Sequence, residues 1–207
     1  MRKINKSFAL LLVCCLIASL LTAFTAPQKT YEDARRSWAW ATLKQWLDNG
    51  WLHGYADGML RPEQPISRAE YAAIVNRAFG LSETSSVSYS DVKASDWYYD
   101  DIAKAVKAGY VIGFEDGSFK PGQAVNRQEA ALILATFLRL DLSRDDVARF
   151  GDAADIDDAS WGAVAVLLAQ NLIQGFPDGT FRPKKPMTRA SAIVMIDAAV
   201  RSGMAAP

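Results

Sequence analysis

Three arginines, Arg68, Arg127 and Arg189, recur with matching neighbours and are the residues whose chemistry the sequence suggests most directly. Each follows a Ser, Asn or Thr, the types that cap helix N-termini, so each is expected at the first position of a helix. The helix dipole disfavours a cation there. One reason for such a placement is an anion, because free N–H groups and a guanidinium would bind a carboxylate through hydrogen bonds of about 1.5–3 kcal/mol each. The other is a structural ion pair, and the residues alone favour neither.

The arginines belong to a pattern that occurs three times in the chain. A loop of the form Gly-x-x-Asp-Gly-x-x-Arg/Lys-Pro occupies residues 54–62, 113–121 and 175–183, at offsets of 59 and 62 residues. Nine residues after each turn glycine stands the expected helix cap: Ser67, Asn126 and Thr188. The acids available for an ion pair are the loop residues Asp57, Asp116 and Asp178 and the Glu of the cap. Repetition over so many positions indicates an architecture of three similar units.

Each unit is predicted to fold as helix, loop, helix. The first helix has apolar residues at helical spacing. It is expected to end at residue types that accept a left-handed backbone, namely Gly50, Gly109 and Asn171. Glu70 and Glu129 stand three residues after their caps and predict a capping box in the first two units, whereas Ser191 predicts a weaker cap in the third. Apolar residues precede each cap in the staple position: Ile66, Val125 and Met187.

These elements predict an all-α fold with unit boundaries at 30–86, 87–146 and 147–207. A pair of helices cannot bury both apolar faces alone, so the three units must pack on one another. Neither end of the chain shows a polar capping repeat, which favours a closed arrangement of pseudo-threefold symmetry over an open stack. Polar stretches at 82–88 and 141–146 link the units, and each unit is expected to start at an aromatic-x-Asp sequence: Tyr31–Asp33, Tyr89–Asp91 and Phe150–Asp152.

The N-terminus is typical of a secretory signal over residues 1–26. Arg2, Lys3 and Lys6 precede an apolar run at 8–24. A retained membrane anchor is the alternative, because 17 apolar residues approach the length that spans a bilayer. We favour cleavage, after which no stable membrane span is expected. Both cysteines, Cys14 and Cys15, lie in the apolar run, so the mature chain has neither disulfides nor thiolate metal sites.

Composition excludes two classes of protein. Half of the 207 residues are apolar and 22% are charged, which excludes intrinsic disorder. Beyond residue 26 the chain has 20 basic and 23 acidic residues, a net charge of −3. A chain of that sign has no overall attraction for nucleic acid, so nucleic acid is not an expected partner.

The Asp-Gly-x-Phe/Leu-Arg/Lys-Pro loop, followed at fixed spacing by Ser/Asn/Thr-Arg-Ala/Gln-Glu, resembles the S-layer homology (SLH) repeat over residues 30–203. The resemblance implies a three-pronged helical fold with the repeats around a pseudo-threefold axis. It also implies a secreted protein at the cell wall or cell surface. Such proteins anchor non-covalently to bacterial wall glycans, commonly secondary polymers that carry pyruvate ketals.

In the family, the Arg of the repeated motif is associated with this acidic ligand, in grooves between neighbouring repeats. The resemblance therefore assigns ligand contact to Arg68, Arg127 and Arg189. The match is unequal, since Gln128 replaces the usual Ala in the second unit and Ser191 replaces the acid in the third. Equal affinity at all grooves is therefore not expected.

Other candidate ligand residues have competing structural roles. Glu70 and Glu129 are expected to cap helices first, worth about 1 kcal/mol, and to contact a ligand only second. The loop bases could form a second wall of a groove or be solvated: Arg61, Lys120 and Arg182. For the tryptophans we favour core packing over stacking on a sugar: Trp38, Trp97 and Trp161.

No metal, cofactor or enzyme activity is expected. The acids at 152, 155, 157 and 158 lack the alternation of an EF-hand loop, and the single histidine, His53, occurs in one unit only. A glycosidase needs only two carboxylates, but the repeats occupy the chain after the signal and no residue of catalytic type stands in a distinctive context. The alternative function is a structural or interaction protein that binds another envelope protein or itself.

Overall fold

The computed structural model describes residues 30–142 and 149–204. Within these ranges it contains α-helices, one 3-10 turn and no sheet: α2 (Trp40–Asp48), α3 (Arg68–Ala78), α4 (Tyr99–Ala108), α5 (Arg127–Phe137), η1 (Ala153–Asp155), α6 (Asp158–Ala169) and α7 (Arg189–Arg201). The all-α prediction is therefore confirmed. The signal prediction for residues 1–26 lies outside the described residues. None of the helices in the described ranges is long and apolar enough to cross a membrane.

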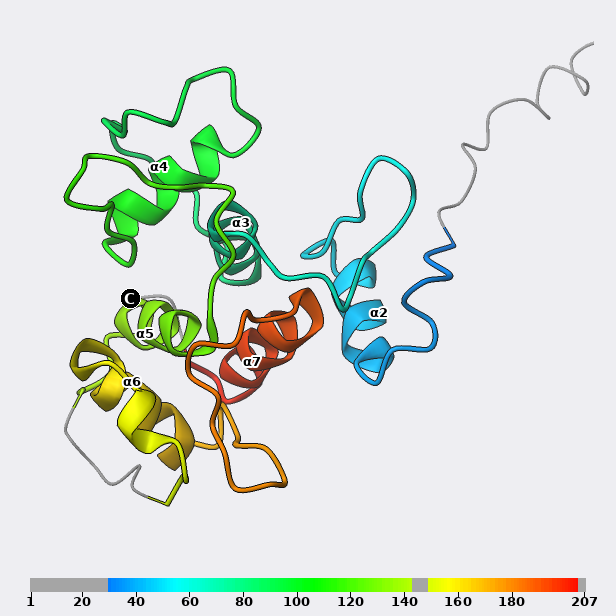
Figure 1. Cartoon of the computed structure of the whole chain (residues 1–207). Coiled ribbons are helices and arrows are strands. Elements are labelled where there is room, and N and C mark those ends of the chain that lie inside the picture. Colours follow the sequence, from blue (N-terminus) through cyan, green and yellow to red (C-terminus); the bar gives the residue numbers. More distant parts are fainter. Residues whose placement is uncertain (1–29, 143–148, 205–207) are drawn as a thin grey trace, which may run out of the picture.

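The helices form three pairs around a common centre (Figure 1). Helix α4 packs on α3, α6 packs on α5, and α2 packs on α7. Each pair therefore joins the first helix of one repeat to the second helix of the preceding repeat. Around the ring, the repeat that precedes repeat 1 is repeat 3. The α2–α7 pair closes the ring, with the buried Trp46 indole donating a 2.8 Å hydrogen bond to Oδ1 of buried Asp197. This arrangement confirms the closed, pseudo-threefold prediction.

Three backbone hydrogen bonds mark the centre of the ring. The N–H of Ile66 donates to the carbonyl of Met187 at 2.9 Å, that of Met187 to Val125 at 2.8 Å, and that of Val125 back to Ile66 at 3.0 Å. All three side chains are buried. The residues that precede the helix caps are therefore apolar because they meet at the pseudo-threefold axis.

The helix ends follow their sequence signals. Ser67, Asn126 and Thr188 each accept a hydrogen bond from the N–H three residues later, at 3.3, 3.0 and 3.2 Å. A full capping box is present in the first two repeats, whereas the Thr188 hydroxyl donates to the Ser191 hydroxyl in the third. The residues past the first helices have left-handed backbone: Gly50, Gly109 and Asn171, with φ of 72°, 76° and 57°.

The start of each repeat is fastened to the loop of the same repeat. In repeat 2, the Asp91 carboxylate accepts hydrogen bonds from the N–H groups of Phe119 and Lys120, both at 2.8 Å. Asp33 and Asp152 do the same in their repeats. The aromatic residue of the start lies against the first loop glycine, where an added Cβ would stand 2.2–2.3 Å from a ring carbon: Tyr31 on Gly54, Tyr89 on Gly113 and Phe150 on Gly175. Glycine is therefore required there by close approach.

Candidate functional site

The motif arginines join neighbouring repeats. Arg68 of repeat 1 donates from Nε to the carbonyl of Phe119 at 2.8 Å and from Nη2 to that of Ile112 at 3.0 Å. Arg127 repeats this pattern on the repeat 3 loop, at 2.9 and 2.8 Å. Arg189 donates from Nη2 to the carbonyl of His53 in repeat 1 at 2.8 Å. Each guanidinium thus binds loop carbonyls of the next repeat around the ring.

The same guanidiniums lie over loop aromatic rings. Arg68 stands 4.9 Å from the ring centre of Phe114, and Arg189 stands 5.0 Å from that of Tyr55. Arg127 lies 4.8 Å from the ring of Phe176. Burial lowers the pKa of all three arginines from its ordinary value. These side chains are therefore part of the packing between repeats.

The N–H groups at the helix starts do not match the expectation of a free anion site. The N–H of Arg68 donates to the carbonyl of Gln123 at 2.9 Å, and that of Ala69 to the carbonyl of Pro121 at 3.1 Å. Helices α5 and α7 make the corresponding bonds to the loops of repeats 3 and 1. The premise of free N–H groups was therefore wrong, because the loop of the next repeat occupies the helix start.

The loop bases pair within their own loops. Arg61 lies 2.7 Å from the Asp57 carboxylate, Lys120 lies 3.3 Å from Asp116, and Arg182 lies 2.6 Å from Asp178. In each pair the base also lies over the loop aromatic ring, at 4.0–4.4 Å from its centre. Hydrogen bonds from Thr180 and Arg182 lower the pKa of Asp178 to about 2. The loop acids therefore serve the loop bases and not the motif arginines.

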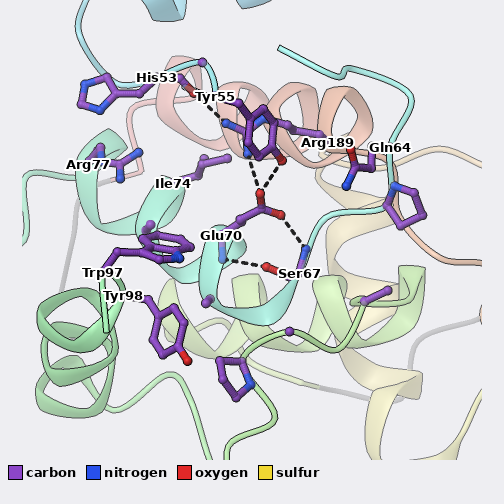
Figure 2. A pocket seen from close by; sticks show the side chains of 17 residues that line it. His53, Tyr55, Gln64, Ser67, Glu70, Ile74, Arg77, Trp97, Tyr98 and Arg189 are labelled. Atoms are coloured by element: carbon purple, nitrogen blue, oxygen red, sulfur yellow. Dashed lines mark hydrogen bonds and ion pairs between the residues drawn. The ribbon is translucent and has the colours of Figure 1, made fainter. Parts of the chain in front are cut away.

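Residues from all three repeats line a cleft of about 680 Å³. It contains three of the predicted site residues: Glu70 of repeat 1, Trp97 of repeat 2 and Arg189 of repeat 3. The other predicted ligand residues lie outside its lining: Arg68, Arg127, Glu129, Trp38, Trp161, Arg61, Lys120 and Arg182. Figure 2 shows Glu70 beneath Arg189 and Tyr55, with Trp97 and Tyr98 on the facing wall.

Glu70 is held by three groups in this cleft (Figure 2). Its carboxylate accepts hydrogen bonds from the Tyr55 hydroxyl and, at 2.9 Å, from the N–H of Ser67. It also lies 3.6 Å from Nη1 of Arg189. Burial, followed by the hydrogen bond to Glu70, raises the pKa of Tyr55 to about 12. Glu70 therefore caps α3 and fixes the tyrosine and arginine at the same time.

Arg189 is less fully bonded than the other two motif arginines. It is 6% exposed, and its Nε is buried without a hydrogen-bond partner among the described residues. Arg77 adds a second cation to the lining, and its Nη2 lies 3.8 Å from the nearest oxygen of Asp101. With Glu70 already accepting hydrogen bonds from its neighbours, the cleft presents Arg77 and the small exposed part of Arg189 to an anion, and the Trp97 ring to an apolar face.

The tryptophans differ from the prediction of core packing. Trp38 and Trp97 stand two residues before α2 and α4 and are 65% and 63% exposed, so the prediction was wrong for both. Trp161 lies inside α6 and packs partly buried against the core. The residue two positions before α6 is Ile156, which is buried. Trp161 is therefore not a third copy of the exposed tryptophan.

Three lining residues were missed by the sequence analysis: Tyr55, Arg77 and Tyr98. A signal existed for Tyr55, because an aromatic residue follows the first loop glycine in every repeat and only this one carries a hydroxyl. Tyr98 adjoins the exposed Trp97. Arg77 has no repeated counterpart, since Thr136 and Ala198 occupy its position in the other repeats.

Comparison with known proteins gives one family. The sequence model of the S-layer homology domain matches residues 30–72, 88–131 and 149–193. The chain is 30% identical over 207 residues to the surface-layer 125 kDa protein of Lysinibacillus sphaericus, covering 98% of this chain and 18% of that protein. It is 29% identical over 163 residues to the cellulosome-anchoring protein of Acetivibrio thermocellus, covering 73% of this chain and 36% of that protein. It is 30% identical over 174 residues to the amylopullulanase of Thermoanaerobacterium thermosulfurigenes, covering 81% of this chain and 9% of that protein. The chain thus spans about a third or less of the length of these relatives.

Proposed function

The chain belongs to the S-layer homology domain family, and on that basis we propose that it anchors non-covalently to the cell wall by binding an anionic secondary wall polysaccharide. Membership of this family places the chain at the cell wall or cell surface. The names of the surface-layer and cellulosome-anchoring relatives support an anchoring role. We further propose that the anionic group is the carboxylate of a pyruvate ketal.

The observation that carries this proposal is the cleft in which three repeats place Arg189, Arg77 and Trp97 together. A carboxylate would gain charge-assisted hydrogen bonds from a guanidinium. The exposed indole of Trp97 provides a flat apolar surface for the face of a sugar ring. Glycan recognition needs both features within reach of one sugar unit.

We propose that the role of this chain is binding and not catalysis. Among the residues that the structure describes, Glu70 is the one carboxylate that lines the cleft. Glycoside hydrolysis needs two carboxyl groups that flank the scissile bond. Glu70 also accepts hydrogen bonds from Tyr55 and Ser67, which suits a fixed support more than a proton donor. The amylopullulanase relative supports the same view. The chain matches 9% of that protein, so most of the enzyme lies outside the part that the chain resembles.

Co-sedimentation with purified cell-wall sacculi tests the proposal. The protein should pellet with intact sacculi and remain in solution after acid removal of the secondary polymers. Trp97→Ala should weaken pelleting, whereas Trp38→Ala is the matched control, since Trp38 has the same exposure and position before its helix but lies outside the cleft. Arg189→Lys should also weaken binding, because lysine cannot make a planar two-point contact.

Two results would contradict the proposal. Pelleting with stripped sacculi would redirect the assignment to peptidoglycan. Failure of the folded wild-type protein to pellet with intact sacculi would refute glycan anchoring.

The second candidate is an interaction protein of the cell envelope. Among the described residues, four large apolar side chains outside the cleft are exposed: Trp38, Met59, Leu142 and Ile112, the last at 81%. Large apolar side chains in contact with water are typical of surfaces that bind another protein. Under this reading Trp38→Ala and Ile112→Ala would weaken association while Trp97→Ala would not.

A further inference from the structure

The groove between each pair of neighbouring repeats can be compared at three equivalent positions. The first position is the second residue of the second helix of one repeat. The other two positions belong to the next repeat: the second residue after its loop Arg or Lys, and the residue directly before its first helix. Between repeats 1 and 2 they are Ala69, Gly122 and Tyr98. All three line the 680 Å³ cleft. Two small residues at these positions leave the cleft open.

Between repeats 2 and 3 the equivalent residues are Gln128, Lys184 and Asp157, and they bond to one another. The Gln128 amide donates from Nε2 to the Asp157 carboxylate and accepts from the N–H of Asp157 at 3.0 Å. The Lys184 ammonium donates to the other carboxylate oxygen. Hydrogen bonds from Lys184 and Gln128 lower the pKa of Asp157. A bonded bridge thus occupies the place of the open cleft.

Between repeats 3 and 1 the equivalent residues are Ala190, Glu63 and Ala39. The small alanines resemble the open cleft, but Glu63 puts an exposed carboxylate where the cleft has Gly122. The hydroxyl of Ser37 donates to Glu63 at 3.4 Å, and no cation of the described residues forms an ion pair with Glu63. A negative charge at this position opposes an anionic sugar.

The motif arginine that lines the open cleft, Arg189, is bonded differently from the other two. Arg68 and Arg127 each donate hydrogen bonds from Nε and Nη2 to two carbonyls. Arg189 donates from Nη2 to one carbonyl and pairs with Glu70 through Nη1 at 3.6 Å, while its buried Nε lacks a partner among the described residues. The cleft with room for a ligand is therefore lined by the motif arginine that donates to one carbonyl where the other two donate to two.

We infer that the three grooves are not equivalent and that the chain binds one anionic glycan unit, in the cleft between repeats 1 and 2. This inference rests on the proposed function. The Gln128–Asp157–Lys184 bridge closes the second groove by filling it, and Glu63 closes the third by its charge. Three similar repeats thus give a single binding site.

Isothermal titration of the full chain with a methyl glycoside that carries a pyruvate ketal tests the inference. We expect one site per chain for the wild type. A triple variant places the three bridge residue types at the equivalent cleft positions: Ala69→Gln, Tyr98→Asp and Gly122→Lys. This variant should abolish binding. Gly122→Lys alone should weaken it about tenfold or more. That substitution suits the fold, since a Cβ at Gly122 meets nothing within 4 Å.

The matched control is Glu63→Lys, which places the same side chain at the equivalent position of the third groove. It should leave affinity at the cleft unchanged. Circular dichroism of each variant establishes that it is folded.

The outcomes separate the two proposals. Two or three sites in the wild type, or a folded Gly122→Lys variant with unchanged affinity, would overturn the single-site inference and leave glycan binding in place. No heat with the wild type would overturn the assignment of a pyruvylated ligand, and the single-site inference with it.

Discussion

Replacing a motif arginine by alanine should lower the free energy of unfolding. The loss should depend on how many hydrogen bonds that arginine makes and not on how deeply it is buried. Arg68→Ala removes two hydrogen bonds from a charged donor, one to the part-buried carbonyl of Phe119 and one to the exposed carbonyl of Ile112, at about 1.5–3 kcal/mol each, or about 3–6 kcal/mol together. Arg127→Ala should cost a similar amount, because its bonds are equivalent.

Arg189→Ala should cost less, although Arg189 is buried. It loses one such hydrogen bond, about 1.5–3 kcal/mol, and an ion pair that we set at about 1 kcal/mol because Glu70 keeps two other donors. The change also removes a buried N–H that has no partner, a relief of about 1–3 kcal/mol. The net loss is then about 1 kcal/mol.

Urea unfolding of the full chain, followed by circular dichroism, measures this order. For an m value of about 2 kcal/mol per molar, the difference of about 3 kcal/mol between Arg68→Ala and Arg189→Ala separates their midpoints by about 1.5 M. Arg61→Ala is the control, because the exposed pair with Asp57 should contribute less than about 1 kcal/mol. An Arg189→Ala variant as unstable as Arg68→Ala would refute this reasoning.

Three further changes have defined outcomes. Ultraviolet titration should show one tyrosine that titrates with a pKa near 12, and this titration should be absent in Tyr55→Phe. The folded pKa of Tyr55 lies above its unfolded value of 10.0. The stability that the protonated hydroxyl contributes is therefore complete below pH 10 and is lost as the pH rises through 12. Gly113→Ala should destabilise by about 1–3 kcal/mol in thermal unfolding, because its Cβ would lie 2.3 Å from a Tyr89 ring carbon, whereas Gly122→Ala should be nearly neutral, and equal losses would contradict the packing. Trp46→Phe should lower stability by about 1–3 kcal/mol in urea, because it leaves the buried Asp197 without its indole donor; an unchanged midpoint would show that the α2–α7 closure does not depend on this bond.

Features determined by a few neighbouring residues could be predicted from the sequence. Ser67 and Glu70 specify a capping box through side chains that bond within one turn. Asn171 ends its helix with a left-handed backbone because its type tolerates that conformation. Closure into a ring followed from the lack of polar terminal repeats, and the structure confirms it.

Features that depend on which surfaces meet could not be predicted. Trp38 and Trp97 are apolar and precede helices, but whether the next repeat covers them depends on helix placement in space. Free N–H groups at the start of the Arg68 helix were a reasonable local expectation. They are not free because the loop of the next repeat accepts their hydrogen bonds. Gln128 was visible as a departure from the repeat, yet its bonding to Asp157 and Lys184 appears only when two repeats are brought together.

The pairing of α2 with α7 also governs the order in which the protein can fold. Trp46 and Asp197 are separated by 151 residues, so a chain emerging N-terminus first presents α2 long before its packing partner exists. Contacts at such separation must overcome a large loss of chain entropy before they stabilise anything. A nascent or translocating chain can therefore pair α3 with α4 and α5 with α6 first, whereas the ring stays open until α7 has emerged to pack on α2.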